Sequence, residues 1–267
     1  MSDQKSTVVI PCAGKGTRLY PLTKNLSKSL VKVGNYKMID YAISECILGN
    51  IDRVVFIISP DDNQLKEHIS NINIDKNMPG IGNNEFIDIE FLIVEQKTPL
   101  GLGNAIYLAK DYILDDSFGI LLPDDLILDG DSVINEMKSV YLTHNINILC
   151  GKYVSQELIP NFGIIETGPR YESVYLTVNK LLEKPNIHET DSNLSILGRY
   201  YLNVRIFDYL DNLEPGYGGE IQLTDALSNM LCDDQFIVIE SERNHFDAGN
   251  LKGLELAEIY LSNHTLW

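Results

Sequence analysis

Short runs of apolar, mostly β-branched residues alternate with segments of helical periodicity over the first half of the chain. The runs cover residues 7–10, 54–58, 89–94 and 119–122. Between them, residues 38–48 and 102–114 place apolar side chains three or four positions apart. Short β-branched runs are typical of buried strands, whereas the wider spacing is typical of one face of a helix. This alternation predicts a parallel sheet covered by helices.

After residue 146 the pattern changes to several strand-like runs in series. These runs cover residues 146–154, 163–167, 174–182 and 196–202. Helical spacing returns at residues 221–231 and 251–261, with a strand-like run at residues 236–240 between them. We therefore predict an added region of mixed or antiparallel sheet, followed by a C-terminal helix.

Length and composition are those of a folded protein without a membrane span. The chain has 267 residues and 44% of them are hydrophobic, which allows a full core in one or two domains. The first residues lack the apolar core of a signal peptide, and no stretch approaches the roughly 18 apolar residues of a membrane span. We predict a cytoplasmic location. The four cysteines, at positions 12, 46, 150 and 232, are too scattered for a metal or redox pair, so we predict reduced and mostly buried thiols.

Charge is distributed unevenly along the chain. The chain contains 21 basic and 38 acidic residues and has a formal charge of -17, which argues against nucleic acid and anionic membranes as partners. Residues 4–39 nevertheless hold seven basic residues and no acidic one. These seven are Lys5, Lys15, Arg18, Lys24, Lys28, Lys32 and Lys37. An acidic protein that keeps such a window is expected to bind an anion there.

A glycine-rich turn follows the first predicted strand, inside this basic window. The turn lies at the carboxyl edge of the predicted sheet, where open α/β folds bind their ligands. It is not a Rossmann fingerprint, because Leu19 occupies the position of the third glycine. It is not a Walker loop either, because no Gly-Lys-Ser/Thr sequence closes it.

The residues of this turn nevertheless suit a phosphate. Gly14 and Gly16 allow positive φ angles, so successive backbone N–H groups can form a concave anion site. Thr17 adds a hydroxyl donor, and the guanidinium of Arg18 matches phosphate oxygens. Lys28, ten residues after Arg18, supplies a further cation. A tight turn with incidental surface cations is the simpler explanation, but it leaves the lack of acidic residues unexplained.

Acidic residues outside the basic window include candidate metal ligands. Asp124 follows the fourth strand-like run and Asp247 precedes the C-terminal helical segment. Carboxylate oxygens are hard ligands that suit Mg²⁺, although each residue could also be an ordinary loop acid. Asp129-Gly-Asp131 matches the D-x-D pattern of metal-dependent glycosyltransferases, but Asp-Gly is a strong turn signal, so we interpret this segment as a turn.

Taken together, the motifs resemble those of sugar-phosphate nucleotidyltransferases. The signature is Gly14-x-Gly16-Thr17-Arg18-Leu19-x-Pro21-x-Thr23-Lys24, followed by Ser27-Lys28. Further segments match in the order of the family, at residues 96–103, 122–124, 162–165, 183–185, 192–193, 198–200, 219–225 and 246–250. Within the family, the chain is most similar to the UTP:glucose-1-phosphate uridylyltransferases of bacterial type.

The resemblance implies a fold and a domain organisation. We expect an α/β fold with a Rossmann-like, mostly parallel central sheet covered by helices and a smaller mixed β region for the sugar. A single nucleotidyltransferase domain would cover residues 1–267. Its nucleotide-binding half would span about residues 1–145, its sugar-phosphate half about residues 146–250, and a C-terminal helix residues 251–267.

The resemblance also implies an activity and assigns residues to it. The expected reaction transfers the uridylyl group of UTP to glucose 1-phosphate with Mg²⁺, releasing pyrophosphate. The catalytic residues would be Arg18, Lys28 and Lys184. The nucleotide would be bound by Ala13, Gly14, Gly16, Thr17, Gln96 and Gly101. The sugar phosphate would be bound by Gly163, Glu183, Lys184, Asn193 and Gly198. The metal ligands would be Asp124 and Asp247.

Alternatives and departures from the family pattern remain at this point. A glucose-1-phosphate thymidylyltransferase is the nearest alternative, and a D-x-D glycosyltransferase or a catalytically silent nucleotide sensor are more distant ones. Ser27-Lys28-Ser29 replaces the usual Pro-Lys-Glu, and Lys252 stands one position later than the lysine of relatives, which leaves its role open. The resemblance further implies a homo-oligomer, either a dimer or a tetramer, whose count the shortened C-terminus leaves open.

Overall fold

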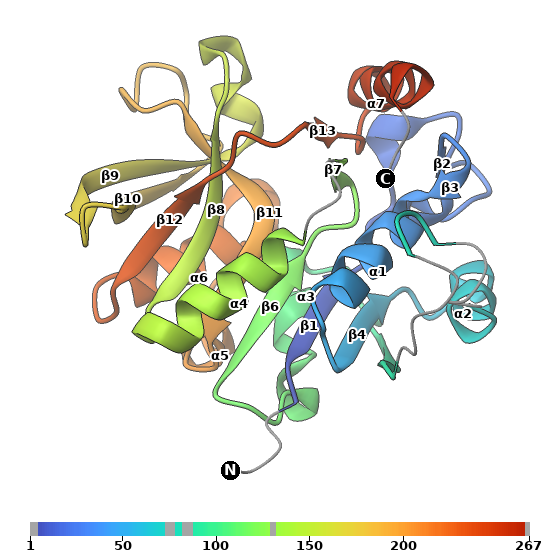
Figure 1. Cartoon of the computed structure of the whole chain (residues 1–267), viewed down its shortest axis with the longest axis horizontal. Helices are drawn as coiled ribbons and strands as arrows, with labels where there is room; N and C mark the ends of the chain where they lie inside the picture. Colours follow the sequence, from blue (N-terminus) through green and yellow to red (C-terminus); the bar gives the residue numbers. More distant parts are fainter. Residues whose placement is uncertain (1–4, 73–77, 82–87, 129–131, 265–267) are drawn as a thin grey trace. The chain divides into compact units, whose positions relative to one another are not determined.

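The computed structural model of the chain describes residues 5–72, 78–81, 88–128 and 132–264 (Figure 1). The D-x-D segment at residues 129–131 lies outside these ranges. The chain forms two compact units, each made of segments that are separate in the sequence. The first unit comprises Met1–Pro99, Leu121–Asn135 and Arg243–Trp267. The second unit comprises Leu100–Ile120 and Glu136–Glu242.

The first unit contains a parallel sheet in the order β5-β4-β1. Its strands are β1 (Thr7–Pro11), β4 (Arg53–Ile58) and β5 (Glu90–Glu95). Thr7 pairs with Arg53, and Arg53 in turn pairs with Glu90, so the three strands are in register at their amino ends. All six residues of β4 are buried, as expected for a strand with both faces covered. The parallel sheet predicted for this part of the chain is thus confirmed.

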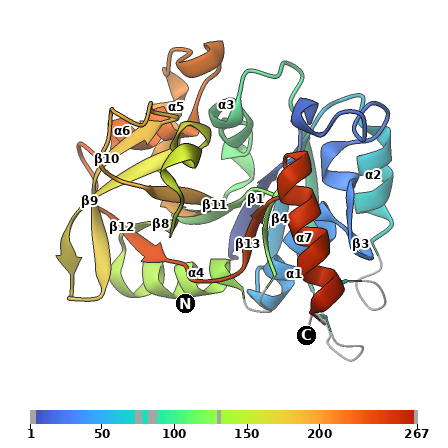
Figure 2. The ribbon, with the colours of Figure 1, turned by 90° about the horizontal axis from the view of Figure 1, so that it is seen from above.

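A second apolar core in the first unit joins segments that are far apart in the sequence. Leu19, Val33, Met38, Leu126 and Ala248 are all buried in it. Figure 2 shows the C-terminal helix lying along this unit. The elements of the first unit besides its parallel strands are η1 (Thr17–Leu19), η2 (Lys28–Leu30), β2 (Lys32–Val33), β3 (Tyr36–Lys37), α1 (Met38–Leu48), α2 (Asn63–Ser70), β7 (Asp125–Ile127), β13 (His245–Asp247) and α7 (Leu251–Asn263).

The second unit is built on a mixed sheet in the order β6-β11-β8-β12-β10-β9. Strand β12 runs parallel to β8, whereas β11 with β8, β10 with β12, and β10 with β9 are antiparallel pairs. The strands are β6 (Ser117–Leu121), β8 (Asn147–Tyr153), β9 (Gly163–Tyr171), β10 (Tyr175–Glu183), β11 (Leu194–Asn203) and β12 (Phe236–Glu240). The mixed region predicted after residue 146 is confirmed.

Helical segments of the second unit partly differ from the predicted ones. The helix predicted over residues 102–114 ends earlier, at Tyr107, and a separate short turn follows at Lys110–Tyr112. Ala105, Ile106 and Ala109 are buried, whereas the residues of the short turn are exposed, so the apolar spacing predicts a buried face only as far as Ala109. The helical elements that begin at or after residue 102 in this part of the chain are α3 (Leu102–Tyr107), η3 (Lys110–Tyr112), α4 (Val133–His144), η4 (Gln156–Asn161), α5 (Ile206–Asp211), η5 (Tyr217–Gly219) and α6 (Leu223–Met230).

The boundaries of the two units differ from the halves expected near residues 145 and 250. Residues 100–120 and 136–145 belong to the second unit, and residues 243–267, whose strand β13 pairs with β7, belong to the first. A pairing between two three-residue strands leaves no periodic signal in a sequence. That the two units together form one nucleotidyltransferase domain stays a prediction.

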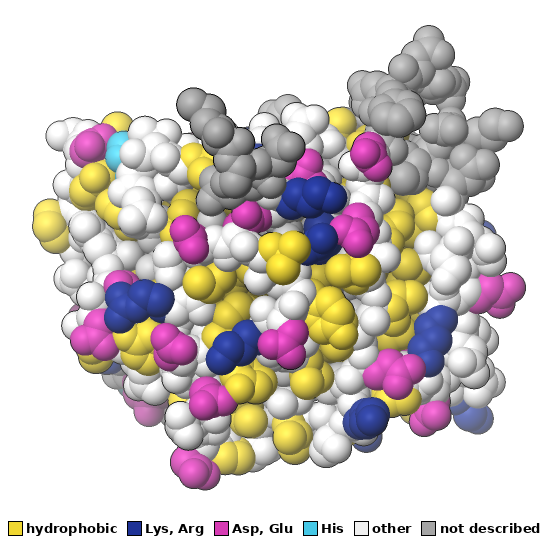
Figure 3. Space-filling model, turned by 90° about the horizontal axis from the view of Figure 1, so that it is seen from below, with side chains coloured by type: hydrophobic (Ala, Val, Ile, Leu, Met, Phe, Trp, Pro, Cys, Tyr) yellow, Lys and Arg dark blue, Asp and Glu magenta, His cyan; other side chains and the backbone are white. Residues whose placement is uncertain are grey.

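The burial of the cysteines agrees with its sequence-based prediction. Cys12, Cys46 and Cys150 are buried free thiols, and Cys232 is an exposed one. On the face drawn in Figure 3, acidic side chains are spread among basic and hydrophobic ones. Within the described part of the chain, none of the helices has the length and apolar character that crossing a membrane requires. The cytoplasmic location stays a prediction.

Candidate active site

Of the two glycines expected to allow positive φ in the turn, Gly16 adopts one and Gly14 does not. Gly16 adopts a left-handed φ of 62°. A Cβ atom at this position would lie 2.9 Å from Cβ of Lys28 and 3.0 Å from Cγ2 of Thr23, so only glycine fits without rearrangement. The Thr23 hydroxyl donates to the Gly16 carbonyl at 2.7 Å and fixes the turn. At Gly14, by contrast, no described atom lies within 4 Å of such a Cβ, so this side of the turn is open.

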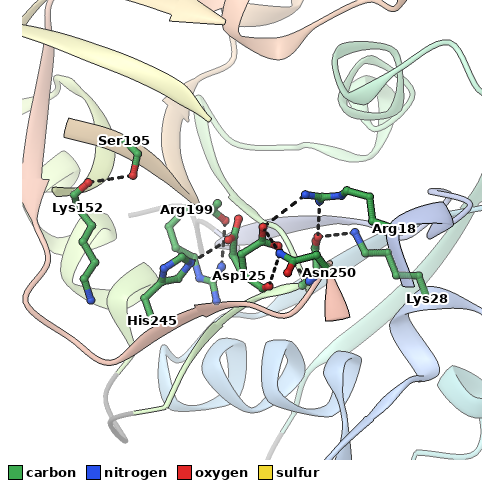
Figure 4. Close-up of polar contacts among 12 residues, drawn as sticks. Arg18, Lys28, Asp125, Lys152, Ser195, Arg199, His245 and Asn250 are labelled. Atoms are coloured by element: carbon green, nitrogen blue, oxygen red, sulfur yellow. Dashed lines mark hydrogen bonds and ion pairs between the residues drawn. The ribbon is translucent and has the colours of Figure 1, made fainter. Parts of the chain in front are cut away.

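Four of the predicted site residues form one charged cluster in the first unit (Figure 4). Lys28 Nζ donates a hydrogen bond to Asp124 Oδ2. Arg18 Nη1 lies 3.4 Å from Asp247 Oδ2, and Arg18 Nη2 lies 4.0 Å from Asp124 Oδ2. The side chains of Lys28, Asp124 and Asp247 are less than one-fifth exposed, whereas that of Arg18 is 56% exposed. The structure thus brings together two cations and two carboxylates from three distant segments.

A two-stranded ribbon positions the two carboxylates of this cluster. Asp125, the first residue of β7, pairs directly with Asp247, the last residue of β13. The Ala248 N–H donates to the Asp124 carbonyl at 2.9 Å and extends this pairing by one bond. His245 Nε2 lies 2.8 Å from Asp125 Oδ1 and places a partner beside that carboxylate. No sequence pattern marks Asp125 or His245, because their strands are too short to leave one.

Asp247 is oriented by the residues that begin the C-terminal helix. The Gly249 N–H donates to Asp247 Oδ1 at 3.0 Å, and Asn250 Nδ2 donates to Asp247 Oδ2 at 2.8 Å. Oδ1 of Asn250 accepts from the Gly253 N–H at 2.9 Å, so the same amide caps α7. Burial raises the pKa of Asp247, and the nearby carboxylate of Asp125 raises that pKa further. The site therefore holds Asp247 in an environment that disfavours its charge.

The second unit contains another group of predicted residues. Glu183, the last residue of β10, pairs with Gly163, the first residue of β9. Lys184 follows with a left-handed φ of 45°, and its N–H donates to the Phe162 carbonyl at 3.1 Å. Its Nζ lies 3.1 Å from Glu183 Oε1. The structure thus brings Gly163, Glu183 and Lys184 together at adjacent strand ends.

Close packing explains the glycine within this group. A Cβ atom on Gly163 would lie 3.1 Å from Cδ1 of Ile196 and 3.3 Å from Oγ1 of Thr224. Both distances are shorter than ordinary van der Waals contacts, so a larger residue would displace its neighbours. A small residue at this position keeps the backbone close to the carboxylate of Glu183, whose Oε2 would lie 3.7 Å from such an atom.

Asn193 and Gly198 have structural partners within the second unit. Asn193 Nδ2 donates to the Val154 carbonyl at 2.7 Å, which holds the segment that leads into β11. Gly198 lies at an irregularity in the pairing of β11 with β8, and its carbonyl accepts a hydrogen bond from Arg199 Nη1 at 3.1 Å. Their expected roles toward the hexose stay predictions.

The two residues expected to bind the base lie in different units. Gln96, in the first unit, is 6% exposed, and its N–H donates to the Ile58 carbonyl at the end of β4. Gly101, in the second unit, has a φ of 108°, and a Cβ atom there would lie 2.7 Å from the Ile221 carbonyl oxygen. This close approach accounts for glycine at position 101. Contacts of either residue with a base stay predictions.

Comparison with known proteins assigns the family. Residues 7–262 match the family described as Nucleotidyl transferase. The chain belongs to this family. This nucleotidyltransferase is 33% identical over 256 residues to a UTP–glucose-1-phosphate uridylyltransferase of Pseudomonas aeruginosa, covering 92% of this chain and 91% of the relative. The family and the fold class expected from sequence are therefore confirmed.

Solved structures of related enzymes have the same fold. A UDP-glucose pyrophosphorylase crystallised with UDP-glucose matches the nucleotidyltransferase with a TM-score of 0.86 and 26% identity, covering 97% of this chain and 100% of that one. A UTP-bound UDP-glucose pyrophosphorylase of Acinetobacter baumannii matches with a TM-score of 0.81 and 26% identity, covering 98% and 95%. The described residues therefore have the arrangement of strands and helices found in these enzymes.

The carboxylates of the nucleotidyltransferase suit a metal ion that is shared with a substrate. A Cβ atom on Gly249 would lie 2.9 Å from Asp247 Oδ1 and would overlap Asp124 Oδ2, so both carboxylates approach the same point. Among the described residues there is no group of three or more His, Cys, Asp or Glu side chains that could hold a metal ion. Mg²⁺ commonly binds one or two carboxylates together with substrate phosphates and water. The residues present therefore fit Mg²⁺.

Relative to its Asp247→Asn variant, the nucleotidyltransferase is expected to gain stability as the pH falls from 8 to 4. Because the folded-state pKa of Asp247 is raised, its ionised form costs stability above that pKa. As the pH falls from the folded-state pKa toward the lower pKa of the unfolded chain, the folded wild type binds a proton that the unfolded chain does not yet bind, so this cost diminishes. Thermal unfolding of both proteins from pH 8 to pH 4 measures the difference. A stability difference that does not shift in favour of the wild type as the pH falls would contradict the raised pKa of Asp247.

Substitutions of Asn250 are expected to separate its two roles. Asn250→Ala removes the helix cap and the bond to Asp247, so it should lower the free energy of unfolding by about 1 kcal/mol and also reduce activity. Asn250→Ser restores a capping hydroxyl but not the donor to Asp247 Oδ2, so it should regain stability without regaining activity. Urea unfolding and steady-state rates measure the two effects. Equal recovery of both in Asn250→Ser would contradict the assignment.

Proposed function

We propose that this nucleotidyltransferase transfers the uridylyl group of UTP to glucose 1-phosphate and releases pyrophosphate, forming UDP-glucose. The observation that carries the proposal is the cluster of Arg18 and Lys28 with Asp124 and Asp247 beside an open glycine-rich turn. The name of the relative from Pseudomonas aeruginosa supports the choice of substrates. The complex of a similar fold with UDP-glucose supports the same product.

The reaction requires charge neutralisation more than a covalent nucleophile. An oxygen of the sugar phosphate attacks the α-phosphorus of UTP, and the bond from that phosphorus to the leaving pyrophosphate breaks. The attacking phosphate is already anionic at neutral pH, so no protein base has to remove a proton. The protein therefore contributes positioning and stabilisation of phosphate charge.

Residues of the first unit would bind the nucleotide phosphates. The backbone N–H groups of Ala13, Gly14 and Gly16, with the Thr17 hydroxyl, would contact phosphate oxygens at the open turn. Arg18 and Lys28, now paired with Asp247 and Asp124, would turn to the phosphates when the nucleotide arrives. Because Arg18 is more than half exposed, it can change partner with little loss of packing.

Asp124 and Asp247 would hold Mg²⁺ when the nucleotide is bound. The metal would neutralise phosphate charge and help fix the phosphate geometry. Both carboxylates would then be freed from Lys28 and Arg18, which bind the phosphates instead. The raised pKa of Asp247 is consistent with a carboxylate placed to receive a cation.

Residues of the second unit would bind the sugar phosphate. Lys184 would bind its phosphate, and Glu183 would accept hydrogen bonds from hexose hydroxyls beside the backbone of Gly163. Asn193 and Gly198 would complete this part of the site. Gln96 and Gly101 would recognise the base. Uracil and thymine differ by one methyl group, so the thymidylyltransferase alternative is decided by experiment.

The proposed function is tested by pyrophosphate release over a panel of substrates. The panel contains each ribonucleoside triphosphate and dTTP, paired with glucose, galactose, mannose and N-acetylglucosamine 1-phosphates, all with Mg²⁺. We expect the largest kcat/KM for UTP with glucose 1-phosphate. A preference for dTTP would establish the thymidylyl reaction instead. No release with any pair would reject the proposal.

We further propose that the protein is a homo-oligomer that buries the outer face of α7. Leu251, Leu256 and Ile259 are about half exposed on this helix. A groove beside it has apolar walls and carries Lys32 and Lys37 as well as Glu255 and Glu258. In a two-fold contact, basic groups of one copy can face acidic groups of the other.

Light scattering after size-exclusion chromatography tests this proposal. The wild type is expected to elute as a dimer or tetramer, and the double variant Leu256→Asp with Ile259→Asp as a smaller species of unchanged secondary structure. A monomeric wild type at micromolar concentration would contradict the proposal, and so would an unchanged oligomer in the double variant.

A further inference from the structure

An aromatic ring faces the ammonium group of Lys184 in the second unit. Lys184 Nζ lies 5.3 Å from the centroid of the Tyr217 ring. A cation within about 6 Å of a ring face is attracted by the quadrupole of the ring. Tyr217 is 58% exposed, so its ring is open to solvent and to a ligand. None of the sequence motifs includes Tyr217.

The loop that carries Tyr217 is held by a hydrogen bond at Tyr217, and no described atom crowds the two glycines that follow. Gln222, which is 6% exposed, donates from Nε2 to the Tyr217 carbonyl at 3.0 Å. Gly218 and Gly219 follow with left-handed φ angles of 70° and 73°. A Cβ atom on either glycine would meet no described atom within 4 Å. The backbone at Tyr217 is therefore anchored, while the next two residues are unhindered.

Lys184 is restrained from two directions. Its Nζ lies 3.1 Å from Glu183 Oε1 and also faces the Tyr217 ring. The side chain of Glu183 is 11% exposed and that of Lys184 is 35% exposed, so the pair lies near the surface without being fully solvated. A free lysine side chain loses rotamer entropy when it is immobilised. Because Lys184 is already restrained in the free protein, it loses less side-chain entropy when a ligand binds.

We propose that Tyr217 is a positioning residue, which holds the Lys184 ammonium in place for the phosphate of an incoming sugar 1-phosphate. The proposal rests on the proposed function, in which Lys184 binds this phosphate. The ring acts through its face and not through its hydroxyl, because the ammonium lies over the ring. Tyr217 therefore sets the affinity for the sugar phosphate and leaves the bond-breaking step to other groups.

The chain offers a matched control for this interaction. Lys110 Nζ lies 5.6 Å from the centroid of the Tyr107 ring, in the same unit. This pair has nearly the same geometry but involves no residue assigned to the substrates. A substitution at Tyr107 therefore removes an equivalent cation–ring contact without touching Lys184.

Steady-state kinetics of four proteins test the role of the ring. Relative to the wild type, Tyr217→Leu is expected to raise KM for glucose 1-phosphate about three- to tenfold, as expected for loss of a partly exposed cation–ring contact. Its kcat and its KM for UTP should stay within about twofold, since ground state and transition state lose the same interaction. Tyr217→Phe should retain wild-type values because it keeps the ring. Tyr107→Leu should also retain the wild-type KM for glucose 1-phosphate.

A spectroscopic measurement tests the geometry without any substrate. Lysines are reductively dimethylated with ¹³C-formaldehyde and a borane reductant, and the Lys184 signal is assigned with Lys184→Arg. We expect the ring of Tyr217 to shift this signal upfield, the shift to persist in Tyr217→Phe and to disappear in Tyr217→Leu. The Lys110 signal should not change in either variant. A Lys184 signal that is the same with and without the ring would overturn the proposed contact.

The failures of this inference and of the proposed function are distinguishable. A wild type without pyrophosphate release would reject the proposed function, while the methyl signals would still report on the contact. An active wild type with an unchanged KM in Tyr217→Leu would overturn the inference and leave the proposed function in place. A KM for glucose 1-phosphate that rises equally in Tyr107→Leu would also overturn it, since the effect would then not be specific to Lys184.

Discussion

Replacing Lys28 by alanine is expected to lower turnover by about 10²-fold or more. Lys28 is the less exposed of the two cations in the charged cluster that it forms with Arg18, Asp124 and Asp247. Its side chain is 19% exposed and donates to Asp124, whereas Arg18 is 56% exposed. A cation held in a partly water-excluded site stabilises developing charge more strongly than an exposed one. Pyrophosphate release at saturating UTP, glucose 1-phosphate and Mg²⁺ measures the loss.

Lys32→Ala is the matched control for this variant. Lys32 lies four residues further along the same basic window, in the two-residue strand β2, and is exposed. It should retain turnover within about twofold, as surface substitutions generally have small effects. Circular dichroism and thermal unfolding of both variants check that each is folded. Near-normal turnover in a folded Lys28→Ala protein would show that the phosphate site has been misassigned.

Replacing Gly249 by alanine is expected to reduce activity by about 10²-fold, although Gly249 carries no chemical group, because small misplacements of catalytic groups have large effects. The Cβ atom of the introduced alanine would overlap Asp124 Oδ2, lie 2.9 Å from Asp247 Oδ1 and lie 3.0 Å from Arg18 Nη2. Three charged groups would therefore have to move apart.

The Mg²⁺ dependence identifies the cause of this loss. If the methyl group separates the two carboxylates, the Mg²⁺ concentration for half-maximal rate should rise in Gly249→Ala, with little change in KM for glucose 1-phosphate. Competition with Mn²⁺, followed by electron paramagnetic resonance in the presence of a nonhydrolysable UTP analogue, measures metal affinity without turnover. Wild-type metal affinity and turnover in this variant would contradict the placement of the two carboxylates.

The parts of the fold that could be predicted from sequence are those with local, periodic signals. Helix α1 and strand β12 were predicted with the bounds that the structure has, because apolar spacing and flanking loop residues mark both ends. The pairing of β7 with β13 could not be predicted. Each strand has three residues, and paired residues are about 120 positions apart, as with Phe246 and Leu126. Hydrophobic periodicity carries no information on such a contact.

The candidate site shows the same division between local motif and distant contact. The conformation at Gly16 followed from its place in a glycine-rich turn, and the motifs named Asp124 and Asp247. The pairing of these carboxylates with Lys28 and Arg18 required the tertiary structure. Tyr217 was missed because a single aromatic residue in a glycine-rich loop is not distinguished by any motif.

The basic window near the N-terminus has several roles in the structure. Arg18 and Lys28 belong to the carboxylate cluster, whereas Lys37 Nζ lies 2.8 Å from Nδ1 of His68. His68 Nε2 in turn lies 2.6 Å from Asp40 Oδ1, so this lysine is part of a contact between α1 and α2. A shortage of acidic residues over residues 4–39 therefore marks the region of the site without identifying each cation as a ligand.

The central claim is that an oxygen of the sugar phosphate attacks the α-phosphorus of UTP, and isotope transfer tests this most directly. Glucose 1-phosphate carrying ¹⁸O at the three terminal phosphate oxygens is incubated with UTP, Mg²⁺ and the protein, and the products are followed by ³¹P nuclear magnetic resonance and mass spectrometry. We predict UDP-glucose that retains all the label, including the oxygen that bridges its two phosphorus atoms, together with unlabelled pyrophosphate. Label in free phosphate or in pyrophosphate, or no UDP-glucose at all, would contradict the account.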